Sequence, residues 1–485
     1  MSECSTTLAF RLARFLVGSL ITHALALVTG PSLVLAWDEF LVLGSDFTTL
    51  GAATVVQRQA PWPAIPDVNF VHSDAVARFH AGLYYVVGRG AANHIQILDP
   101  AAGYQTQRQF SLGAGRNPQD IAFAPSGAAY VTCYDTAELL KIDVQSGSIL
   151  ASFSTAAFAD GDGLPETGWL ICVGDKLYIT CQLLDRANWY LPTGPGRLLV
   201  FDTVTDTWID RDPGTPQPDG LVLQGANPYT QLQLASNRSN LRVGCSGVYG
   251  VWDGGVEVID LASQASLGFE ISEAELGGDI VDFVVSGPAT AYAIVSDTSF
   301  QTAVVAYVPL GGGDVQVVAA ANSYAFVDLA YDGEQYLYLA DRTVGGAGLR
   351  VFQSESGDEL TSIPVPTGLP PAQIILPVEA SLVAVPGIAT VPPARIQLAP
   401  PWPNPANPCT HIDFRASPAT SVTVRVLDLR GRLVRLARME TDAQGQGKFQ
   451  FDGLDRSGRP VAAGAYRVVI DDGGFQATAG LTLVR

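Results

Sequence analysis

Charged side chains are scarce in this sequence, and those present are mainly acidic. Only 15% of the 485 residues are charged, and 47 acidic against 28 basic residues give a net charge of −19. This balance argues against nucleic acid and anionic membrane surfaces as partners. The acidic residues do not form runs, which is typical of a soluble, acidic exterior.

Cysteine is also rare, with six residues, and Cys4 lies in a segment predicted to be removed. An odd number therefore remains, which argues against a full disulfide framework. The spacing shows no paired metal-ligand motif, so buried free thiols are expected. The five residues are Cys133, Cys172, Cys181, Cys245 and Cys409.

Long apolar runs are missing except near the N-terminus. Arg11 and Arg14 precede an apolar run over 15–28, and the small-residue site Val34-Leu35-Ala36 follows. This order is that of a secretory signal peptide over residues 1–36, with cleavage after Ala26 as the alternative. No cysteine follows the run, which argues against a lipoprotein, and no membrane span is expected after cleavage. The sequence predicts a secreted protein, extracellular or on the outer cell surface, with the periplasm as the alternative.

Glycine and proline, in contrast, are abundant, with 49 and 31 residues, and this favours an all-β protein. A degenerate repeat fills residues 37–377, with intervals of roughly 45–65 residues. Each unit has a first strand, a turn, a second strand with a central tyrosine, a third strand and a variable outer strand. The tyrosine column contains Tyr85, Tyr130, Tyr178, Tyr292 and Tyr338, with Arg242 as the exception.

Six full units are present, with incomplete material at both ends. Residues 40–47 and 52–59 look like second and third strands, and 370–376 look like a first strand. Joined, they predict a seventh blade shared by the two ends, which removes exposed sheet edges. The fold prediction is a seven-bladed β-propeller closed by both termini. The repeats resemble the YVTN family of β-propellers, through Tyr130-Val131-Thr132 and Tyr178-Ile179-Thr180.

After a linker over 378–397, residues 398–485 have the strand period of a small β-sandwich. Alternating segments occur at 422–428, 447–453, 465–472 and 481–485. The segments Pro403-Asn404-Pro405, Asp428–Arg432, Asp452-Gly453, Ser457–Val461 and Gly464-Ala465-Tyr466 carry a resemblance to the Ig-like domain of the flagellar hook-cap protein FlgD. They also resemble the C-terminal sorting domains of type IX secretion. Phe451 stands where that family usually has Trp, and either ring fills a sandwich core. The resemblance implies export and surface attachment through secretion machinery.

The first-strand column places Asp74, Asp120, Asp282 and Asp328 at equivalent positions, with Thr230 or Gln231 and with Gln373 in two other units. First strands are innermost in a propeller, so these groups are expected to ring one mouth of the central channel. A carboxylate ring there suits a cation such as Ca²⁺ or an amine. The structural alternative is that each Asp accepts N–H groups and holds its blade in place.

A second candidate for Ca²⁺ is the loop with Asp160, Asp162 and Glu166, whose alternate carboxylates and glycines suit that ion. The alternative is a solvated loop between blades. His72 lies near the predicted mouth and is the plausible general base. Cys133, Cys181 and Cys245 share one repeat column, and core packing between blades is expected for them.

No Gly-x-Ser-x-Gly elbow, phosphate loop or metal-spaced histidine pair is present. The sequence therefore predicts a binding or structural protein, with the propeller as a recognition platform for a glycan, peptide or protein and no cofactor other than possible Ca²⁺. Because some seven-bladed relatives are lactonases or lyases, an enzyme acting at the channel mouth is the alternative.

Overall fold

The computed structural model describes residues 38–211, 219–236, 238–287, 289–309, 315–377, 396–398, 401, 403–416, 421–428, 432–442, 446–455, 459–471 and 476–484. The predicted signal peptide, its cleavage site and nearly all of the predicted linker lie outside these residues. No helix within the described ranges is long and apolar enough to cross a membrane.

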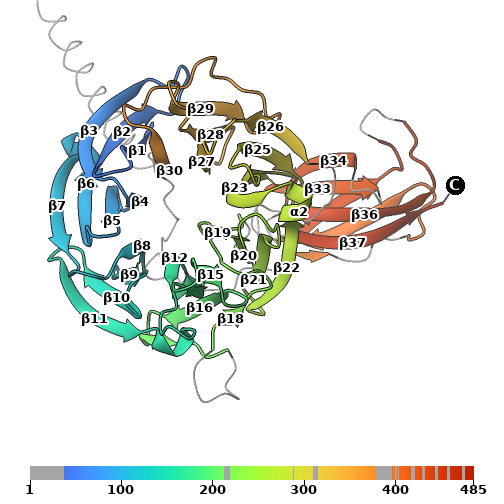
Figure 1. Cartoon of the computed structure of the whole chain (residues 1–485). Coiled ribbons are helices and arrows are strands. Elements are labelled where there is room, and N and C mark those ends of the chain that lie inside the picture. Colours follow the sequence, from blue (N-terminus) through green and yellow to red (C-terminus); the bar gives the residue numbers. More distant parts are fainter. Residues whose placement is uncertain are drawn as a thin grey trace, which may run out of the picture. The chain divides into compact units, whose positions relative to one another are not determined.

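In the part of the chain that the structure describes, seven antiparallel sheets are arranged around a ring, so the fold is a β-propeller (Figure 1). Blade 1 is a four-stranded sheet of β4 (Ala75–His80), β5 (Leu83–Gly88), β6 (His94–Asp99) and β7 (Gln105–Ser111). Blade 2 is a four-stranded sheet of β8 (Pro118–Phe123), β9 (Ala129–Cys133), β10 (Glu138–Asp143) and β11 (Ser148–Ser154). Blade 3 contains β12 (Thr167–Val173), β13 (Lys176–Cys181), β16 (Arg197–Asp202), β17 (Thr207–Trp208) and β18 (Leu221–Val222). The hairpin β14 (Leu184–Asp185) and β15 (Leu191–Pro192) extends from it.

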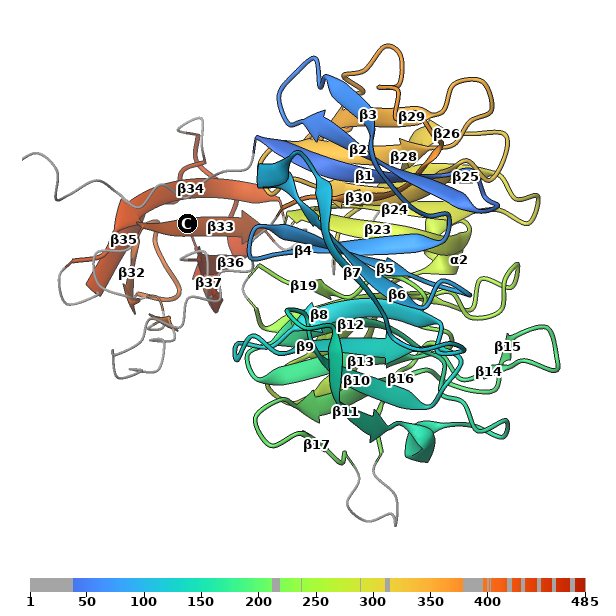
Figure 2. The ribbon, with the colours of Figure 1, turned by 90° about the vertical axis from the view of Figure 1, so that its left-hand side faces the viewer.

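Blade 4 contains β19 (Gln233–Leu234), β20 (Asn240–Cys245), β21 (Gly255–Asp260) and β22 (Ala265–Ser272). Blade 5 contains β23 (Asp279–Gly287), β24 (Thr290–Ser296), β25 (Thr302–Tyr307) and β26 (Gln316–Ala320). Blade 6 has β27 (Phe326–Tyr331), β28 (Tyr336–Asp341) and β29 (Gly348–Gln353), with bridges to Val365 and Glu359 on its outer side. Short helices are η1 (Pro100–Ala102), η2 (Ala156–Phe158) and α2 (Glu273–Leu276). Figure 2 shows α2 and the β14–β15 hairpin on the same side of the ring.

The seventh blade is shared by both ends of the propeller, as predicted. Its strand order is β30 (Pro371–Ile375), β1 (Glu39–Ser45), β2 (Leu50–Gln57) and β3 (Ala64–His72). Strand β1 lies between β2 and β30, with Val42 opposite both Thr54 and Ile374. The Thr54 hydroxyl also donates to the Thr367 carbonyl, 2.7 Å away and 313 residues later. The ring is therefore closed by pairing between distant parts of the chain.

Apolar side chains fill the layers between neighbouring blades. The tyrosine column lies in these layers, because second-strand side chains alternate between the two faces of each sheet. Tyr130, Tyr292 and Tyr338 are at most 1% exposed. The cysteine column packs there too, with Cys133, Cys181 and Cys245 fully buried as free thiols. The prediction of core packing for these cysteines is confirmed.

The C-terminal residues form two sheets, as an Ig-like sandwich requires. One contains β31 (Gln397–Leu398), β32 (Thr410–Arg415) and β35 (Gln446–Phe451); the other contains β34 (Leu433–Glu440), β33 (Ser421–Asp428), β36 (Gly464–Asp471) and β37 (Gln476–Leu483). The sequence prediction missed β32 and β34. Phe451 is fully buried, and the Tyr466 hydroxyl donates to the Ala462 carbonyl at 2.6 Å.

Candidate ligand site at the channel mouth

One mouth of the channel holds a cavity of about 700 Å³, at the end where the innermost strands begin. Because each blade is antiparallel, the loop after its second strand returns to this same end. We call these segments the mouth loops. They bring Phe47, Arg89, Tyr134, Gln182 and Arg342 into the lining of the cavity. The site is thus built from strand ends and loops of different blades around one axis.

Each residue of the tyrosine column pairs with a residue of the innermost strand, and we call the position two residues before that partner the slot. In blades 1 to 6 the slot holds Val76, Asp120, Trp169, Gln231, Asp282 and Asp328. In the shared blade, where Leu41 pairs with Ile375, the slot holds Gln373. The predicted equivalence of Asp74 is therefore wrong. Tyr85 pairs with Arg78, which puts Val76 in the slot and Asp74 two residues earlier. Of the two alternatives in blade 4, Gln231 occupies the slot.

Four of the slot side chains tie one blade to the next. Asp282 Oδ2 accepts the Leu329 N–H at 2.8 Å, and Asp328 Oδ2 accepts the Ile374 N–H at 2.8 Å. Gln373 Oε1 accepts the Ala77 N–H at 2.7 Å, and Asp120 Oδ2 accepts the Leu170 N–H at 3.1 Å. These donors belong to innermost strands rather than to loops. The expected role of holding the blades in place is therefore present, and it acts between neighbouring blades.

Asp120 and Arg78 form an ion pair that does not line the cavity. Asp120 is fully buried, and its two oxygens lie 2.7 Å from Nε and Nη2 of Arg78. The guanidinium also donates to Gln231 and lies 5.2 Å from the Trp169 ring centroid. Gln231 and Trp169 do line the cavity. The ion pair thus supports side chains of the cavity wall from behind.

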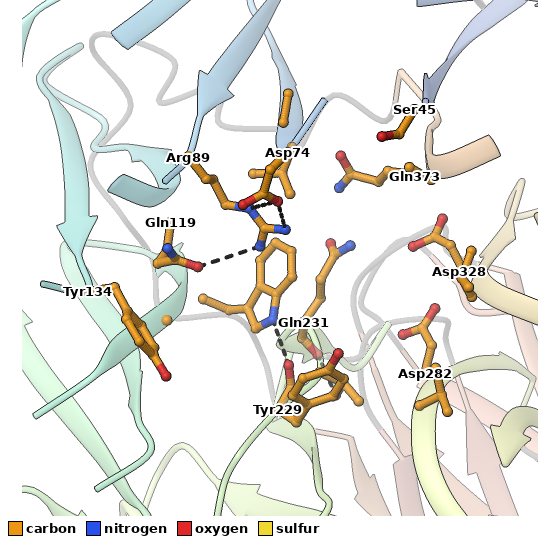
Figure 3. Close-up of a pocket in the computed structure, with 18 of the residues that line it drawn as sticks. Ser45, Asp74, Arg89, Gln119, Tyr134, Tyr229, Gln231, Asp282, Asp328 and Gln373 are labelled. Carbon is orange, nitrogen blue, oxygen red and sulfur yellow. Dashed lines mark hydrogen bonds and ion pairs between the residues drawn. The ribbon is translucent and has the colours of Figure 1, made fainter. Parts of the chain in front are cut away.

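Asp282 and Asp328 lie next to each other on one wall of the cavity, across from Asp74 and Arg89 (Figure 3). We call them the acidic pair. Burial raises the pKa of Asp282 to about 7. Burial, and then the charge of Asp282, raise the pKa of Asp328 well above its ordinary value. Ionising the pair therefore costs free energy, because burial removes most of the water that would solvate its negative charge.

The basic side chains of the cavity are already engaged. Arg89 contacts the Asp74 carboxylate through Nε at 2.9 Å and Nη2 at 2.5 Å. Arg342 donates its Nε–H to the Pro371 carbonyl at 2.8 Å, and its guanidinium lies over the Phe47 ring at 4.8 Å. The cavity is therefore largely preformed, with polar groups fixed by the fold.

His72 ends β3, the outer strand of the shared blade, and is not among the residues lining the cavity. Its Nδ1 accepts the Asp74 N–H at 3.1 Å. The strand assignment explains the difference from the prediction, because His72 belongs to an outer strand although it is two residues from Asp74.

The predicted calcium loop is not assembled as a metal site. Glu166 is fully buried, and its carboxylate binds Arg186 Nε at 2.8 Å and the Leu184 N–H at 3.1 Å. Asp160 instead accepts the Thr193 hydroxyl, and Asp162 accepts the Leu164 N–H. Within the described ranges, no group of three or more His, Cys, Asp and Glu side chains could hold a metal ion.

The sequence prediction missed the aromatic and basic residues that line the cavity. Six aromatic side chains line the cavity: Phe47, Tyr134, Trp169, Tyr190, Tyr229 and Tyr324. Trp169 is fixed by its Nε1–H, which donates to the Tyr229 carbonyl at 2.7 Å. A signal for part of this set was available, because Arg89, Tyr134, Gln182 and Arg342 directly follow the second strands of their repeats.

Residues 410–473 match the FlgD Ig-like domain family. Comparison with curated protein sequences gives no match. Among solved structures, PorZ of Porphyromonas gingivalis, described as a bacterial surface component of the type-IX secretion system, is 14% identical with a TM-score of 0.43. That comparison covers 90% of this chain and 64% of PorZ, so the chain matches less than two thirds of that protein.

Two further structures are similar at the same low level of identity. Hydrazine synthase of Kuenenia stuttgartiensis is 16% identical with a TM-score of 0.45, over 63% of this chain and 92% of that one. AztD of Citrobacter koseri is 10% identical with a TM-score of 0.42, over 85% of this chain and 98% of that one. The C-terminal module is therefore similar to FlgD Ig-like domains, and none of these structural likenesses assigns an activity.

Proposed function

We propose that this protein is an exported binding protein of the cell surface, whose propeller recognises a ligand at the channel mouth. The observation that carries the proposal is the preformed cavity of about 700 Å³, which six aromatic side chains line together with fixed polar groups. Ligand sites have this size and combine apolar walls with a few oriented polar groups. The blades are inferred to be of the YVTN type, on the motifs in blades 2 and 3.

A test of recognition uses arrays of printed glycans and peptides probed with the full chain. Binding is expected to fall at least tenfold in a Tyr190→Ala/Tyr229→Ala variant, because truncating an aromatic anchor costs more than about 1 kcal/mol. Both rings are half exposed at the cavity, at 51% and 47%. The matched control is Phe70→Ala, which removes a ring of similar exposure from outer strand β3. Equal loss in both variants, or no array signal, contradicts recognition at the mouth.

The C-terminal sandwich is proposed as a sorting or anchoring module that engages secretion machinery. Its support is the match to the FlgD Ig-like family and a separate apolar core that includes Ile412, Val424, Phe451 and Val468. Because this core lies within the sandwich itself, its removal should leave the propeller able to fold.

Removing residues 398–485 is expected to give a folded propeller that crosses the inner membrane but does not reach the cell surface. The predicted signal peptide directs the first step, and the tail directs the second. Fractionation and surface proteolysis of cells that express the full or truncated chain measure the difference. If both forms are equally exposed on the surface, the tail is a spacer and the sorting role is withdrawn.

An enzyme acting at the mouth is the second candidate, because the acidic pair combines a cavity position with raised pKa values, as general acids and bases do. A lactonase or lyase would lose turnover in an Asp282→Asn variant while it still binds substrate. A binding protein would lose affinity instead.

A further inference from the structure

Exposed aromatic side chains are concentrated on the mouth side of the propeller. Of the nine aromatic residues with strongly exposed side chains in the described part of the chain, only Phe70 lies on an outer strand. The other eight lie in mouth loops or in segments that lead into innermost strands: Phe47, Trp189, Tyr190, Tyr229, Tyr249, Trp252, Phe300 and Tyr324. We call these eight residues the aromatic rim. Clustered exposed aromatic residues are typical of interaction surfaces.

The rim extends beyond the cavity. Trp189 is 90% exposed between β14 and β15, and it is not among the cavity residues. Tyr249 and Phe300, from the mouth loops of blades 4 and 5, stack with centroids 5.0 Å apart and planes 17° apart. A small ligand held in the cavity would leave these rings uncovered. The rim therefore fits a partner that covers several blades.

The acidic pair lies in the wall of the cavity, which four residues of the rim also line. Asp282 is 8% exposed and Asp328 is 7% exposed, yet both line the cavity. Each uses Oδ2 for the N–H of the next blade, and Asp328 Oδ1 has no hydrogen-bond partner among the described residues. No lysine or arginine in those residues forms an ion pair with either carboxylate. Arg342 and Arg78 act on Asp328 only from a distance, since both guanidinium groups have other partners.

A buried carboxylate pair without a counter-ion selects for a ligand that supplies positive charge. An ammonium group on a flexible apolar stem satisfies it best, because its three N–H donors can reach both carboxylates while the stem packs on aromatic rings. A neutral sugar supplies no positive charge and would therefore not favour the ionised form of the pair. The overall charge of −19 likewise favours a basic partner over an acidic one.

We infer that the aromatic rim docks a polypeptide segment of a partner protein and that the cavity receives a lysine side chain of that segment at Asp282 and Asp328. This inference rests on the proposed recognition at the mouth and names its ligand class. The aromatic rim supplies contact area on both sides of the lysine, and the acidic pair selects the side chain. A second copy of this chain is a poor occupant, because its own surface is acidic.

Calorimetric titration with two matched probes tests the selection directly. The probes are Nα-acetyl-lysine methylamide and Nα-acetyl-norleucine methylamide, which differ in the ammonium group. The wild-type full chain is expected to bind the lysine probe at least tenfold more tightly. Equal affinities for the two probes would overturn the inference, and this comparison needs no variant.

Variants then locate the effect. Asp282→Asn and Asp328→Asn keep an oxygen for the Leu329 and Ile374 N–H groups, so the blades should stay joined while the charge is lost. Each variant is expected to lose at least tenfold in affinity for the lysine probe. The matched control is Asp332→Asn, in the turn at the opposite end of β27, where the carboxylate accepts backbone N–H groups. An equal loss in the control, or none in the Asn variants, counts against the acidic pair.

The printed arrays separate this inference from the proposed function. Enrichment of lysine-containing peptides, lost in Asp328→Asn and in Tyr190→Ala/Tyr229→Ala, supports both. Binding only to glycans, sensitive to the tyrosine variant and indifferent to Asp328→Asn, overturns the lysine inference and leaves recognition at the mouth intact. The absence of any tyrosine-sensitive signal overturns both.

Discussion

A chain that lacks residues 37–60 is expected to lose the cooperative unfolding transition of its propeller. The deletion removes β1 and β2. In β1 alone, the side chains of four consecutive apolar residues are at most 1% exposed: Phe40, Leu41, Val42 and Leu43. Burying one large apolar side chain contributes about 1.5–3 kcal/mol. Four such losses are comparable with the whole stability of a folded domain, about 5–15 kcal/mol. The innermost strand β30 would also lose its partner and expose an unpaired edge.

Urea denaturation followed by near-ultraviolet circular dichroism measures this effect. Two point variants provide a finer version of the same experiment. Val42→Asp places a charge in a fully buried position of β1 and should cost at least about 3 kcal/mol. Leu50→Asp makes a similar change at the start of β2, where the residue is 41% exposed, and should cost less than about 1 kcal/mol. A truncated chain with an unchanged midpoint and slope would show that the shared blade is not required.

Replacing Asp120 by Ala is expected to destabilise the propeller by about 3–5 kcal/mol, the cost of removing one partner of a buried ion pair. The carboxylate is fully buried, and the side chain of Arg78 is 27% exposed. Without Asp120, the guanidinium keeps only its contacts with Gln231 and Trp169, and the Leu170 N–H loses its acceptor. The wall behind the cavity would lose its support at the same time.

A double-mutant cycle with Arg78→Met separates the pair from the rest of the site. The double variant should cost less than the sum of the two single variants, because neither charge is then left unpaired. The control is the ion pair of Asp74 and Arg89, in which the side chain of Asp74 is 51% exposed. Asp74→Ala should therefore destabilise the propeller by at most about 1 kcal/mol. A cost for Asp120→Ala no larger than that of the control would contradict the importance of the buried pair.

The blades could be predicted because their signal is local. A tyrosine in the second strand recurs in five of the six full units, and an Asp ends the third strand in four of them. Two of these residues, Asp99 and Asp260, begin tight turns in the structure, since their carboxylates accept N–H groups two and three residues later. The shared blade could be predicted because strands without partners remained at both ends of the repeat region. Joining them into one sheet closes the ring.

The residues of the slot were harder to predict, because a backbone N–H group of an innermost strand can be accepted either by the slot residue of the preceding blade or by a side chain of its own blade. The alignment of the repeats matched one Asp to another and therefore selected Asp74 in blade 1. The strand pairing places Val76 in the slot of that blade. Val76 has no acceptor side chain for the next blade. The corresponding N–H, that of Ile121, is instead accepted at 2.9 Å by the carboxylate of Asp120, its own neighbour. An apolar residue is tolerated in the slot for this reason.

The aromatic rim escaped prediction because loops have no period. Their lengths differ from blade to blade, so Trp189 and Phe300 occupy no shared column. What places them together is the antiparallel topology, which returns each mouth loop to the same end of the ring. The acidic pair was among the predicted residues, but its burial and its missing counter-ion depend on packing between blades 5, 6 and 7, which no single repeat contains.

The closure of the ring also sets the order in which the protein can mature. Strand β1 is made early, but its partner β30 arrives only after the rest of the propeller has been synthesised. The entropy cost of joining segments so far apart makes this pairing a late and slow event. Until it occurs, the innermost strand of the shared blade is missing and the ring stays open. A propeller fastened by its two ends can therefore be completed only after the chain has been made as far as β30.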